Sequence, residues 1–414
     1  MPVTDKSRSQ GASSEVVRDI NRRIVLNLIR KRQPISRADL ARVSGMQRST
    51  ISLIVDQLIQ ENWVLTGPTV RLPRGRRPTR LRLNDERVMI GVDIRPAQIT
   101  VALADANGRF VSQEAIVTTP DPEFTLGRLV EVIQRIVASC RGRKIEGIGV
   151  SVPGRYIPGS NRLVFAPNLG WRDVDIRTPL MKATGLEVEI ENAATACALA
   201  AVWFDHMEQV RNLVVVTVSE GVGTGILLNG QIVRGVNGMA GEFGHVPLDP
   251  QGPLCGCGRR GCWEVFASNR AALRYYQESG SESAGLSFLD LLSLADQGDR
   301  RAEEALKTMA YHLGRGMRML VAGFAPERIV VIGDLTRSWK RFEAVIEPEI
   351  LEQVLPGGMA PQLIPAREGG VARLRGTVAL VLENDFGVCA REPASGRPRR
   401  NQAYERDLHF LFAI

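Results

Sequence analysis

The segments VSEGVGTGILLNGQIVRGVNGMAGEFGH (218–245) and CGCGRRGCWE (255–264) decide how this sequence is interpreted. The first places a glycine-rich stretch between two strand-like apolar runs. The second crowds three cysteines into eight residues, and His245 precedes them in the chain. Sulfur and imidazole side chains gathered in this way indicate a metal site.

One imidazole and three thiolates match the tetrahedral preference of Zn²⁺, and a site filled entirely by protein ligands is structural. Glycines between the cysteines allow the loop to curl tightly enough for the sulfurs to converge. The alternatives are a reactive dithiol switch and three buried apolar cysteines, but a loop rich in glycine and arginine is a poor place to bury sulfur. We therefore predict one structural zinc ion per chain. Its expected ligands are His245, Cys255, Cys257 and Cys262.

The sequence around these segments predicts an open α/β architecture with two lobes. An amphipathic helix is expected over 123–140, a group of helices over about 265–325, and a further strand–helix crossover at 328–335. Strands and helices mixed in this way are typical of layered α/β folds. The expected strands, separated by Asp, Asn and Gly turns, are 88–94, 99–105, 108–117, 145–154, 213–218 and 226–233.

Charge is distributed unevenly along the 414 residues. Residues 1–90 contain 18 lysines and arginines against 8 acidic residues, a net charge of +10, whereas the remaining 324 contain 35 against 37. A basic block joined to a near-neutral body is typical of a nucleic-acid-binding segment. The alternative is a solvated basic tail, which charge alone does not exclude.

The basic block has the pattern of a winged helix-turn-helix. Helical spacing predicts a helix over 16–32 that ends at Gln33 and Pro34, a short helix capped by Ser36, and a third helix over 47–61. Two strands, 63–65 and 81–83, enclose a basic loop that forms the wing. The apolar residues expected to face the core are Val17, Ile20, Ile24, Leu28, Leu40, Val43, Ile51, Ile54, Val55 and Leu58.

The first turn of the second motif helix meets base edges in the major groove in this kind of module. That turn is polar here, and the wing is rich in arginine, which suits a narrow minor groove. Phosphate contacts are expected from Arg22, Arg37 and Arg42. A three-helix interaction module with a solvated loop is the alternative. The predicted DNA contacts are Arg37, Gln47, Arg48, Ser49, Thr50, Ser52, Arg74, Arg76 and Arg77.

The body resembles the ROK family (repressors, open reading frames and sugar kinases). The opening segments carry the resemblance, together with SVPGRY (151–156), FAPNLGW (165–171) and ENAATACALA (191–200) in the family's order. The resemblance implies an actin-like pair of α/β lobes, of the sugar-kinase and ribonuclease H-like type, with a sugar cleft between them. With the N-terminal module, the chain is similar to the family's repressors for xylose, N-acetylglucosamine and glucose. The expected divisions are a DNA-binding domain at 16–84, lobes at 88–200 and 201–387, and a tail at 388–414.

A carboxylate that accepts two hydrogen bonds, helped by amide and imidazole groups, holds a pair of sugar hydroxyls well. Glu242 and Glu264 lie close in sequence to the expected metal ligands, so the metal loop would fix one carboxylate on each side of a pocket. Either glutamate alone would be a solvated surface acid. By resemblance to the family, the sugar-binding residues are Gly154, Asn168, Asn192, Glu242, His245 and Glu264.

The kinase machinery of the family is incomplete here. The family's kinases carry an aspartate at the position of Ala193, and alanine cannot accept the proton of a sugar hydroxyl. Their first phosphate loop, Asp-x-Gly-Gly-Thr, corresponds to Asp93-Ile94-Arg95-Pro96-Ala97, in which both glycines are missing. The segment VIGDL (331–335) also lacks the second glycine expected around adenosine, whereas the glycine-rich loop 221–225 is intact. We therefore predict no enzymatic activity and no catalytic residue.

These features predict a transcriptional regulator, most simply a repressor, whose binding to double-stranded operator DNA is controlled by a sugar or sugar phosphate. A homodimer or a dimer of dimers is expected from the symmetry of operators and from the family. The alternatives are an active ATP-dependent sugar kinase with an appended DNA-binding domain and a scaffold with an empty cleft. The sequence contains no run of about 18 apolar residues and no apolar signal core, so a cytoplasmic protein without a membrane partner is expected.

Overall fold

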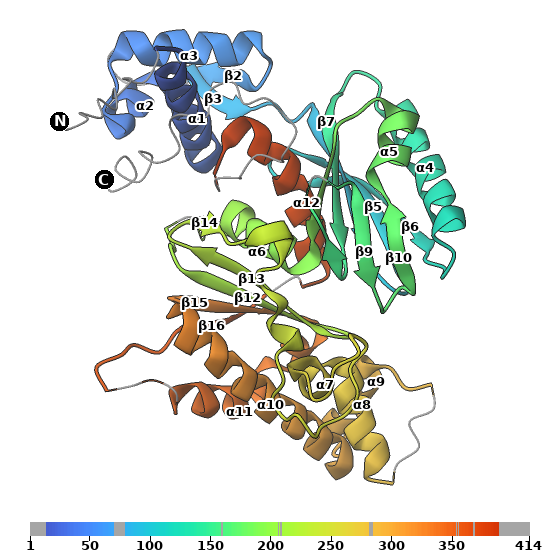
Figure 1. Ribbon diagram of the computed structural model, residues 1–414. Coiled ribbons are helices and arrows are strands. Elements are labelled where there is room, and N and C mark those ends of the chain that lie inside the picture. Colours follow the sequence, from blue (N-terminus) through green and yellow to red (C-terminus); the bar gives the residue numbers. More distant parts are fainter. Residues whose placement is uncertain are drawn as a thin grey trace, which may run out of the picture. The chain divides into compact units, whose positions relative to one another are not determined.

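A computed structural model of the chain describes residues 14–69, 79–158, 160–205, 207, 209–280, 285–352, 354, 356–366 and 369–388. These residues form two compact units. The first contains the chain up to Asp85 together with residues 385–388, and the second contains Glu86–Asn384 (Figure 1). No helix in the described part of the chain is both long enough and apolar enough to span a bilayer.

The first unit is a three-helix module with a small antiparallel sheet of order β1-β3-β2, which confirms the predicted winged helix-turn-helix pattern. Val64 pairs with Leu83 across β2 and β3, as the predicted wing strands require. The bounds are α1 (Ser14–Arg32), β1 (Ile35–Ser36), α2 (Arg37–Ser44), α3 (Arg48–Gln60), β2 (Val64–Thr69) and β3 (Thr79–Leu83).

Local chemistry sets the ends of α2. The Ser36 hydroxyl accepts a hydrogen bond from the Asp39 backbone N–H at 3.1 Å, which confirms the predicted N-cap. Gly45 ends the helix in the left-handed conformation at φ 70°, which glycine adopts without a steric penalty.

The core of the first unit is formed by α3, α2 and the C-terminal half of α1. The predicted apolar face of α3, Ile51, Ile54, Val55 and Leu58, is buried. Two other predictions were wrong, because Val17 is 46% and Val43 37% exposed. The residues of α1 that are fully buried are Val25, Leu26 and Ile29.

The first unit also includes the end of α12 (Gly369–Phe386), the last described helix of the chain. The Phe386 side chain is fully buried, and its ring meets the Trp63 ring edge-on, with 5.3 Å between centroids. The Asn27 side-chain amide donates to the Phe386 carbonyl at 2.9 Å. The helix-turn-helix core is therefore completed by residues distant in sequence.

The second unit contains two five-stranded mixed sheets of the same plan. In the sheet β11-β7-β4-β5-β6, β4 to β6 form an antiparallel meander and β7 and β11 add in parallel. In the sheet β14-β13-β12-β15-β16, β12 to β14 form the meander and β15 and β16 add in parallel. This repeated plan agrees with the expected two-lobed α/β fold. The bounds are β4 (Arg87–Ile94), β5 (Gln98–Asp105), β6 (Phe110–Val117), β7 (Lys144–Val152), β11 (Val188–Asn192), β12 (Leu213–Val218), β13 (Val222–Leu228), β14 (Gln231–Ile232), β15 (Arg328–Ile332) and β16 (Gln362–Pro365).

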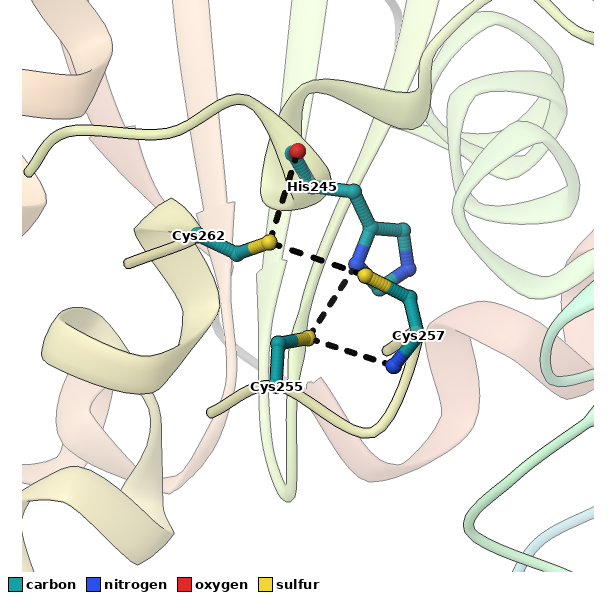
Figure 2. Close-up of side chains that lie close together, drawn as sticks. All are labelled: His245, Cys255, Cys257 and Cys262. Atoms are coloured by element: carbon teal, nitrogen blue, oxygen red, sulfur yellow. Dashed lines mark hydrogen bonds between the residues drawn. The ribbon is translucent and has the colours of Figure 1, made fainter. Parts of the chain in front are cut away.

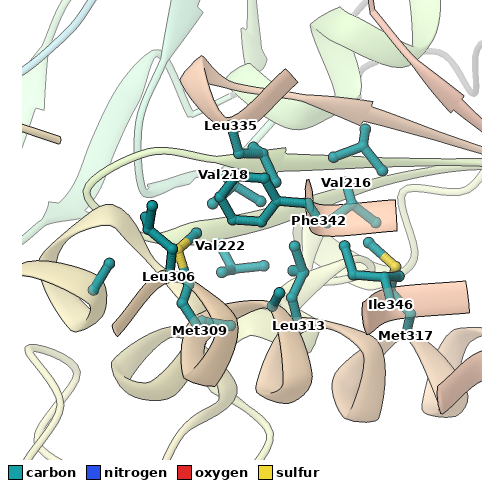
Figure 3. Close-up of a cluster of buried hydrophobic side chains, with 14 of the residues drawn as sticks. Val216, Val218, Val222, Leu306, Met309, Leu313, Met317, Leu335, Phe342 and Ile346 are labelled. Atoms are coloured by element: carbon teal, nitrogen blue, oxygen red, sulfur yellow. The ribbon is translucent and has the colours of Figure 1, made fainter. Parts of the chain in front are cut away.

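Helices bury the apolar faces of these sheets. In Figure 3, side chains of α10 and α11 meet Val216 and Val218 of β12, and Phe342 lies at the centre of this fully buried cluster. A small sheet of order β10-β9-β8 extends the first lobe. The remaining elements are α4 (Pro122–Ser139), β8 (Arg155–Tyr156), β9 (Arg162–Ala166), β10 (Trp171–Asp175), α5 (Arg177–Thr184), α6 (Ala193–Phe204), η1 (Val236–Gly238), η2 (Glu242–His245), α7 (Trp263–Ala267), α8 (Asn269–Glu278), α9 (Phe288–Asp296), α10 (Arg300–Phe324), η3 (Asp334–Ser338) and α11 (Trp339–Leu351).

Candidate functional site

The four predicted metal ligands converge at the loop between η2 and α7 (Figure 2). Their ligand atoms all lie within 4.8 Å of one another. Cys257 Sγ is 3.7 Å from Cys262 Sγ, and Cys255 Sγ is 3.6 Å from His245 Nδ1. Three sulfurs and one ring nitrogen thus surround one point.

The backbone of the loop makes this convergence possible. The Cys255 N–H donates to the Arg259 carbonyl at 2.7 Å, which folds the two ends of the cysteine segment together. Gly261 has φ 66°, and a side chain there would place its Cβ 1.5 Å from the Asp249 carbonyl oxygen. Only glycine fits at this position, just before the last cysteine.

The geometry fits a tetrahedral metal ion. With metal–sulfur bonds of about 2.3 Å and a metal–nitrogen bond of about 2.0–2.1 Å, ligands at tetrahedral corners lie roughly 3.6–3.8 Å apart. The separations of 3.7 and 3.6 Å match that requirement. Burial raises the pKa of Cys262 to about 11 and also raises the pKa of Cys255, so a bound cation is what would convert these thiols to thiolate ligands. This cluster can hold a metal ion.

The metal loop also positions two carboxylates around His245. The His245 ring presents Nδ1 to the sulfur cluster, while its Nε2 lies 3.8 Å from Glu242 Oε2. Glu264 Oε1 lies 3.5 Å from His245 Nδ1 and accepts from the Cys255 thiol at 2.9 Å. Burial raises the pKa of Glu242, and the charge of His245 lowers it. Glu242 and Glu264 therefore lie on either side of one imidazole.

Asn168 and Gly154 extend this group in two directions. A Cβ on Gly221 would lie 2.5 Å from Glu264 Oε2 and 3.8 Å from Asn168 Nδ2, so these two polar groups lie together beside the glycine-rich loop. The Asn192 amide donates to the Gly154 carbonyl at 3.0 Å, and its oxygen accepts from the Ala194 N–H at 2.8 Å. Both ends of the Asn192 side chain are thus engaged, so it caps α6 and holds the Gly154 turn.

The position expected to hold a catalytic acid is Ala193, the first residue of α6. Its side chain is 7% exposed and carries no proton acceptor. Nearby, Arg95 Nε lies 2.5 Å from Asp93 Oδ2, and Arg95 NH2 donates to the Gly370 carbonyl at 3.0 Å. Asp93 is buried and also accepts from the Ser151 hydroxyl at 3.1 Å. The turn that the sequence predicts to correspond to the first phosphate loop is therefore occupied by a guanidinium group.

The glycines of loop 221–225 have a packing role. A Cβ on Gly225 would lie 2.3 Å from the Ala194 carbonyl oxygen, and one on Gly223 would lie 3.1 Å from the Ala194 side chain. The first turn of α6 approaches the β13 backbone too closely for larger residues. An intact glycine-rich loop therefore needs no nucleotide to explain it.

In the first unit, α3 presents a polar first turn to solvent. Gln47, Arg48 and Ser49 are exposed, and Thr50 and Ser52 are half-buried. Leu53, which sequence reasoning missed, is 73% exposed one turn further along the same helix. The wing residues Arg74, Arg76 and Arg77 lie outside the described residues.

The three arginines predicted to contact phosphate differ in their environments. Arg42 is 77% exposed and pairs with the neighbouring Asp39 at 2.5 Å. Arg37 pairs with Asp56 of α3 at 2.6 Å and donates to the Ser52 carbonyl at 3.4 Å, so it braces α2 against α3. Arg22 was predicted wrongly: its side chain is 13% exposed and pairs with Glu61 inside the unit.

Comparisons with known proteins agree with this architecture. The ROK family model matches residues 89–384, and the MarR family model matches residues 24–65. The chain is 32% identical to the xylose repressor of Bacillus spizizenii over 382 residues, which cover 91% of this chain and 98% of that protein.

Solved structures of ROK family proteins are also similar to it. A ROK family transcriptional regulator, described as a homolog of the Escherichia coli MLC protein, matches with a TM-score of 0.77 and 26% identity, over 89% of this chain and 98% of its own. A ROK family glucokinase from Streptomyces griseus, in complex with glucose and AMPPNP, matches with a TM-score of 0.64 and 29% identity, over 71% of this chain and 98% of its own. The extent of these matches establishes that the chain belongs to the ROK family and carries a helix-turn-helix module ahead of its ROK domain.

Proposed function

We propose that this protein is a DNA-binding transcriptional repressor controlled by a sugar or sugar derivative bound in a kinase-like cleft that performs no phosphoryl transfer. The observation that carries the proposal is a contrast within the second unit. The groups suited to holding sugar hydroxyls converge around His245, whereas the phosphate turn is filled by Arg95 and the acid position is Ala193.

The proposed sugar site contains Gly154, Asn168, Asn192, Glu242, His245 and Glu264. The two carboxylates and the imidazole accept hydrogen bonds from adjacent sugar hydroxyls, and the Asn168 amide donates hydrogen bonds to other hydroxyls. Asn192 contributes by fixing the Gly154 turn, since both of its amide atoms are already bonded. Removing a general base typically slows a reaction by about 10²–10⁴-fold, so the alanine at 193 supports binding without turnover.

The cysteine–histidine cluster is proposed to bind one structural Zn²⁺ per chain. Its ligands would be Cys255, Cys257, Cys262 and His245 Nδ1, a set that leaves no position open for catalysis. Zinc would supply the charge that keeps the thiolates together and would orient the imidazole toward Glu242. Because the same loop carries Glu264, metal binding and sugar binding would support each other.

DNA binding is proposed for the first unit, with α3 in the major groove. Gln47, Arg48, Ser49, Thr50 and Ser52 would approach base edges, Arg42 would contact phosphate, and Arg37 would hold α3 in place. Arg74, Arg76 and Arg77 would enter the minor groove from the wing. A homodimer or dimer of dimers on a pseudo-palindromic operator would provide the second recognition helix.

The controlling step would be a shift between conformations that bind DNA well and poorly. A sugar changes this equilibrium only to the extent that it binds one conformation more tightly than the other. The test is fluorescence anisotropy of labelled DNA from upstream of the gene, at stated salt, with and without a panel of sugars. Sequence-dependent binding that one sugar releases supports the proposal, whereas weak, salt-sensitive binding that no sugar changes contradicts it.

A second candidate is an active sugar kinase, favoured by the likeness to the Streptomyces griseus glucokinase over 71% of this chain. A coupled ATP assay with hexoses, aminohexoses and their N-acetyl forms separates the two. Turnover of about 1 s⁻¹ or more would establish the kinase.

A further inference from the structure

Arg155 is an unusual residue beside the proposed sugar site. It belongs to β8, where the next residue, Tyr156, is buried in the core of the lobe, so Arg155 extends from the opposite face of the strand. Its side chain is half-buried, and its Nε atom is buried without a hydrogen-bond partner in the described part of the chain.

Arg155 directly follows Gly154, whose carbonyl accepts a hydrogen bond from the Asn192 amide at 3.0 Å, so the turn before Arg155 belongs to the proposed sugar site. No carboxylate of the described residues lies within 4.0 Å of the guanidinium nitrogens of Arg155. Two other arginines of this unit that are buried or half-buried do have such partners. Arg87 pairs with Glu146 at 2.6 Å, and Arg234 pairs with Glu191 at 2.8 Å.

A second arginine adjoins the same site from the other lobe. Arg270 lies in the first turn of α8, and its NH1 donates to Asn168 Oδ1 at 2.8 Å. It too has no carboxylate within 4.0 Å among the residues that the structure describes. Because Arg270 occupies the oxygen of Asn168, the amide of Asn168 is left to donate to a ligand.

Among the described residues, neither carboxylate of the site lies within 4.0 Å of a guanidinium nitrogen of Arg155 or Arg270. Glu242 lies beside His245 Nε2, and Glu264 is engaged with the Cys255 thiol and with His245 Nδ1. A neutral monosaccharide needs acceptors and amide donors, which the site already has. Arg270 is exposed, but the partial burial of the unpaired Arg155 guanidinium costs free energy that only an anionic partner recovers well.

We propose that the effector is an acidic sugar whose carboxylate or phosphate group binds Arg155, while Arg270 adds positive charge and orients Asn168. The guanidinium fork donates two parallel hydrogen bonds to either anion, and such charge-assisted bonds are roughly twice as strong as neutral ones. This inference rests on the proposed function and specifies its ligand class. Arg155 would be a specificity-determining residue, and no bond is made or broken in the step.

The experiment is titration calorimetry on the full-length, metal-loaded protein. The acidic ligands are the sugar acids glucuronate, galacturonate and gluconate and the sugar phosphates glucose 6-phosphate and N-acetylglucosamine 6-phosphate. The neutral ligands are the parent sugars of these acids and phosphates, together with xylose. Inorganic phosphate is titrated alone. We expect one acidic sugar to bind at least about tenfold more tightly than its neutral parent, a difference of about 1.4 kcal/mol. The carboxylate and phosphate arms identify which anion is recognised.

Variants assign the effect to Arg155. Arg155→Gln is expected to weaken binding of the acidic sugar by about tenfold or more while leaving its neutral parent within about twofold, and Arg155→Lys is expected to restore part of the loss. Arg172→Gln is the matched control, because Arg172 is an exposed arginine that stacks on Phe165 of the same small sheet. Unchanged thermal unfolding of each variant shows that it folds.

The outcomes separate this inference from the proposed function. A neutral sugar that binds as tightly as its acidic counterpart, and that releases DNA, overturns the acidic-sugar inference and leaves the proposed function standing. Equal losses for acidic and neutral sugars in Arg155→Gln also overturn it, because they indicate a structural role. Absence of binding by every sugar in the panel contradicts both.

Discussion

The Arg95 guanidinium lies 2.5 Å from the Asp93 carboxylate at the end of β4, and it also donates to the Gly370 carbonyl where α12 begins. Burial lowers the pKa of Arg95, but the Asp93 charge and hydrogen bond outweigh that effect and raise it, so Arg95 stays charged. An internal ion pair thus occupies the turn that, by resemblance to the family's kinases, we predict to be a degenerate phosphate loop.

This pair predicts that restoring the missing acid alone will not restore catalysis. Ala193→Asp is expected to give no ATP turnover above background, because Arg95 and Pro96 still fill the turn. The wild-type protein is likewise expected to show no thermal stabilisation by Mg²⁺–ATP, whereas a ligand that binds the folded state would stabilise it. The measurement is a coupled ATP assay beside thermal unfolding. Turnover by the wild-type protein or by the single variant would contradict the prediction.

Removal of the metal is expected to damage two properties at once. Elemental analysis of protein purified without chelator should find one zinc per chain, and Cys257→Ser should lose it. The variant should also lose several kcal/mol of unfolding free energy and its sugar-induced stabilisation, since the loop positions both His245 and Glu264. Cys140→Ser, which alters a half-buried cysteine outside the cluster, is the control. Full sugar binding by metal-free protein would refute the coupling.

The first turn of α3 and the surface of α2 should respond differently to mutation. If Arg48 contacts a base, Arg48→Ala costs about 1–3 kcal/mol and relaxes sequence preference at one position. Arg42→Ala should weaken binding to all sequences alike and reduce the slope of log K against log salt by about 1. Anisotropy titrations on operator and scrambled DNA distinguish these effects. Arg128 is an exposed arginine of α4, and the control variant Arg128→Ala should change neither the sequence preference nor the salt dependence of DNA binding.

Phe386 is expected to stabilise the DNA-binding unit although it lies more than 300 residues from α3. Its ring is fully buried against Trp63, and Phe→Ala substitutions in a core cost about 3–5 kcal/mol. Hydrogen exchange of the α1 and α3 amides in the full-length protein reports this local loss. Phe124→Ala, which removes a ring that is 58% exposed, should leave that exchange unchanged. If the α1 and α3 amides exchange at the same rate in Phe386→Ala as in the wild-type protein, the end of α12 is dispensable for the stability of the DNA-binding unit.

Local sequence patterns are sufficient to predict much of the architecture. Ser36 caps α2 because a hydroxyl in that position satisfies a free N–H, and Gly45 ends the helix because it adopts positive φ; both effects act within a few residues. The spacing of His245 and the cysteines likewise carried enough chemistry to predict their convergence. The predicted strands of both lobes follow from apolar runs bounded by turn residues.

What the sequence could not indicate depends on partners distant along the chain. Arg22 has the composition of a phosphate contact, but Glu61 and Asp385 surround it in the folded unit. Val17 and Val43 fit helical spacing, yet the core of the unit is centred elsewhere on α1 and α2. The absence of a carboxylate partner for Arg155 among the described residues, like the pairing of Arg95 with Asp93, depends on three-dimensional neighbours, which no local pattern encodes.

The most direct test of sugar-controlled DNA binding compares the wild-type protein with Glu242→Ala in one anisotropy experiment. Each is bound to labelled operator DNA at fixed salt and titrated with the sugar that binds most tightly in calorimetry. We expect equal operator affinity, release of the wild-type protein by the sugar, and retention of Glu242→Ala on the DNA, because this substitution removes a carboxylate of the proposed sugar site and leaves the first unit intact. Release of both proteins at the same sugar concentration, or of neither, would contradict the account.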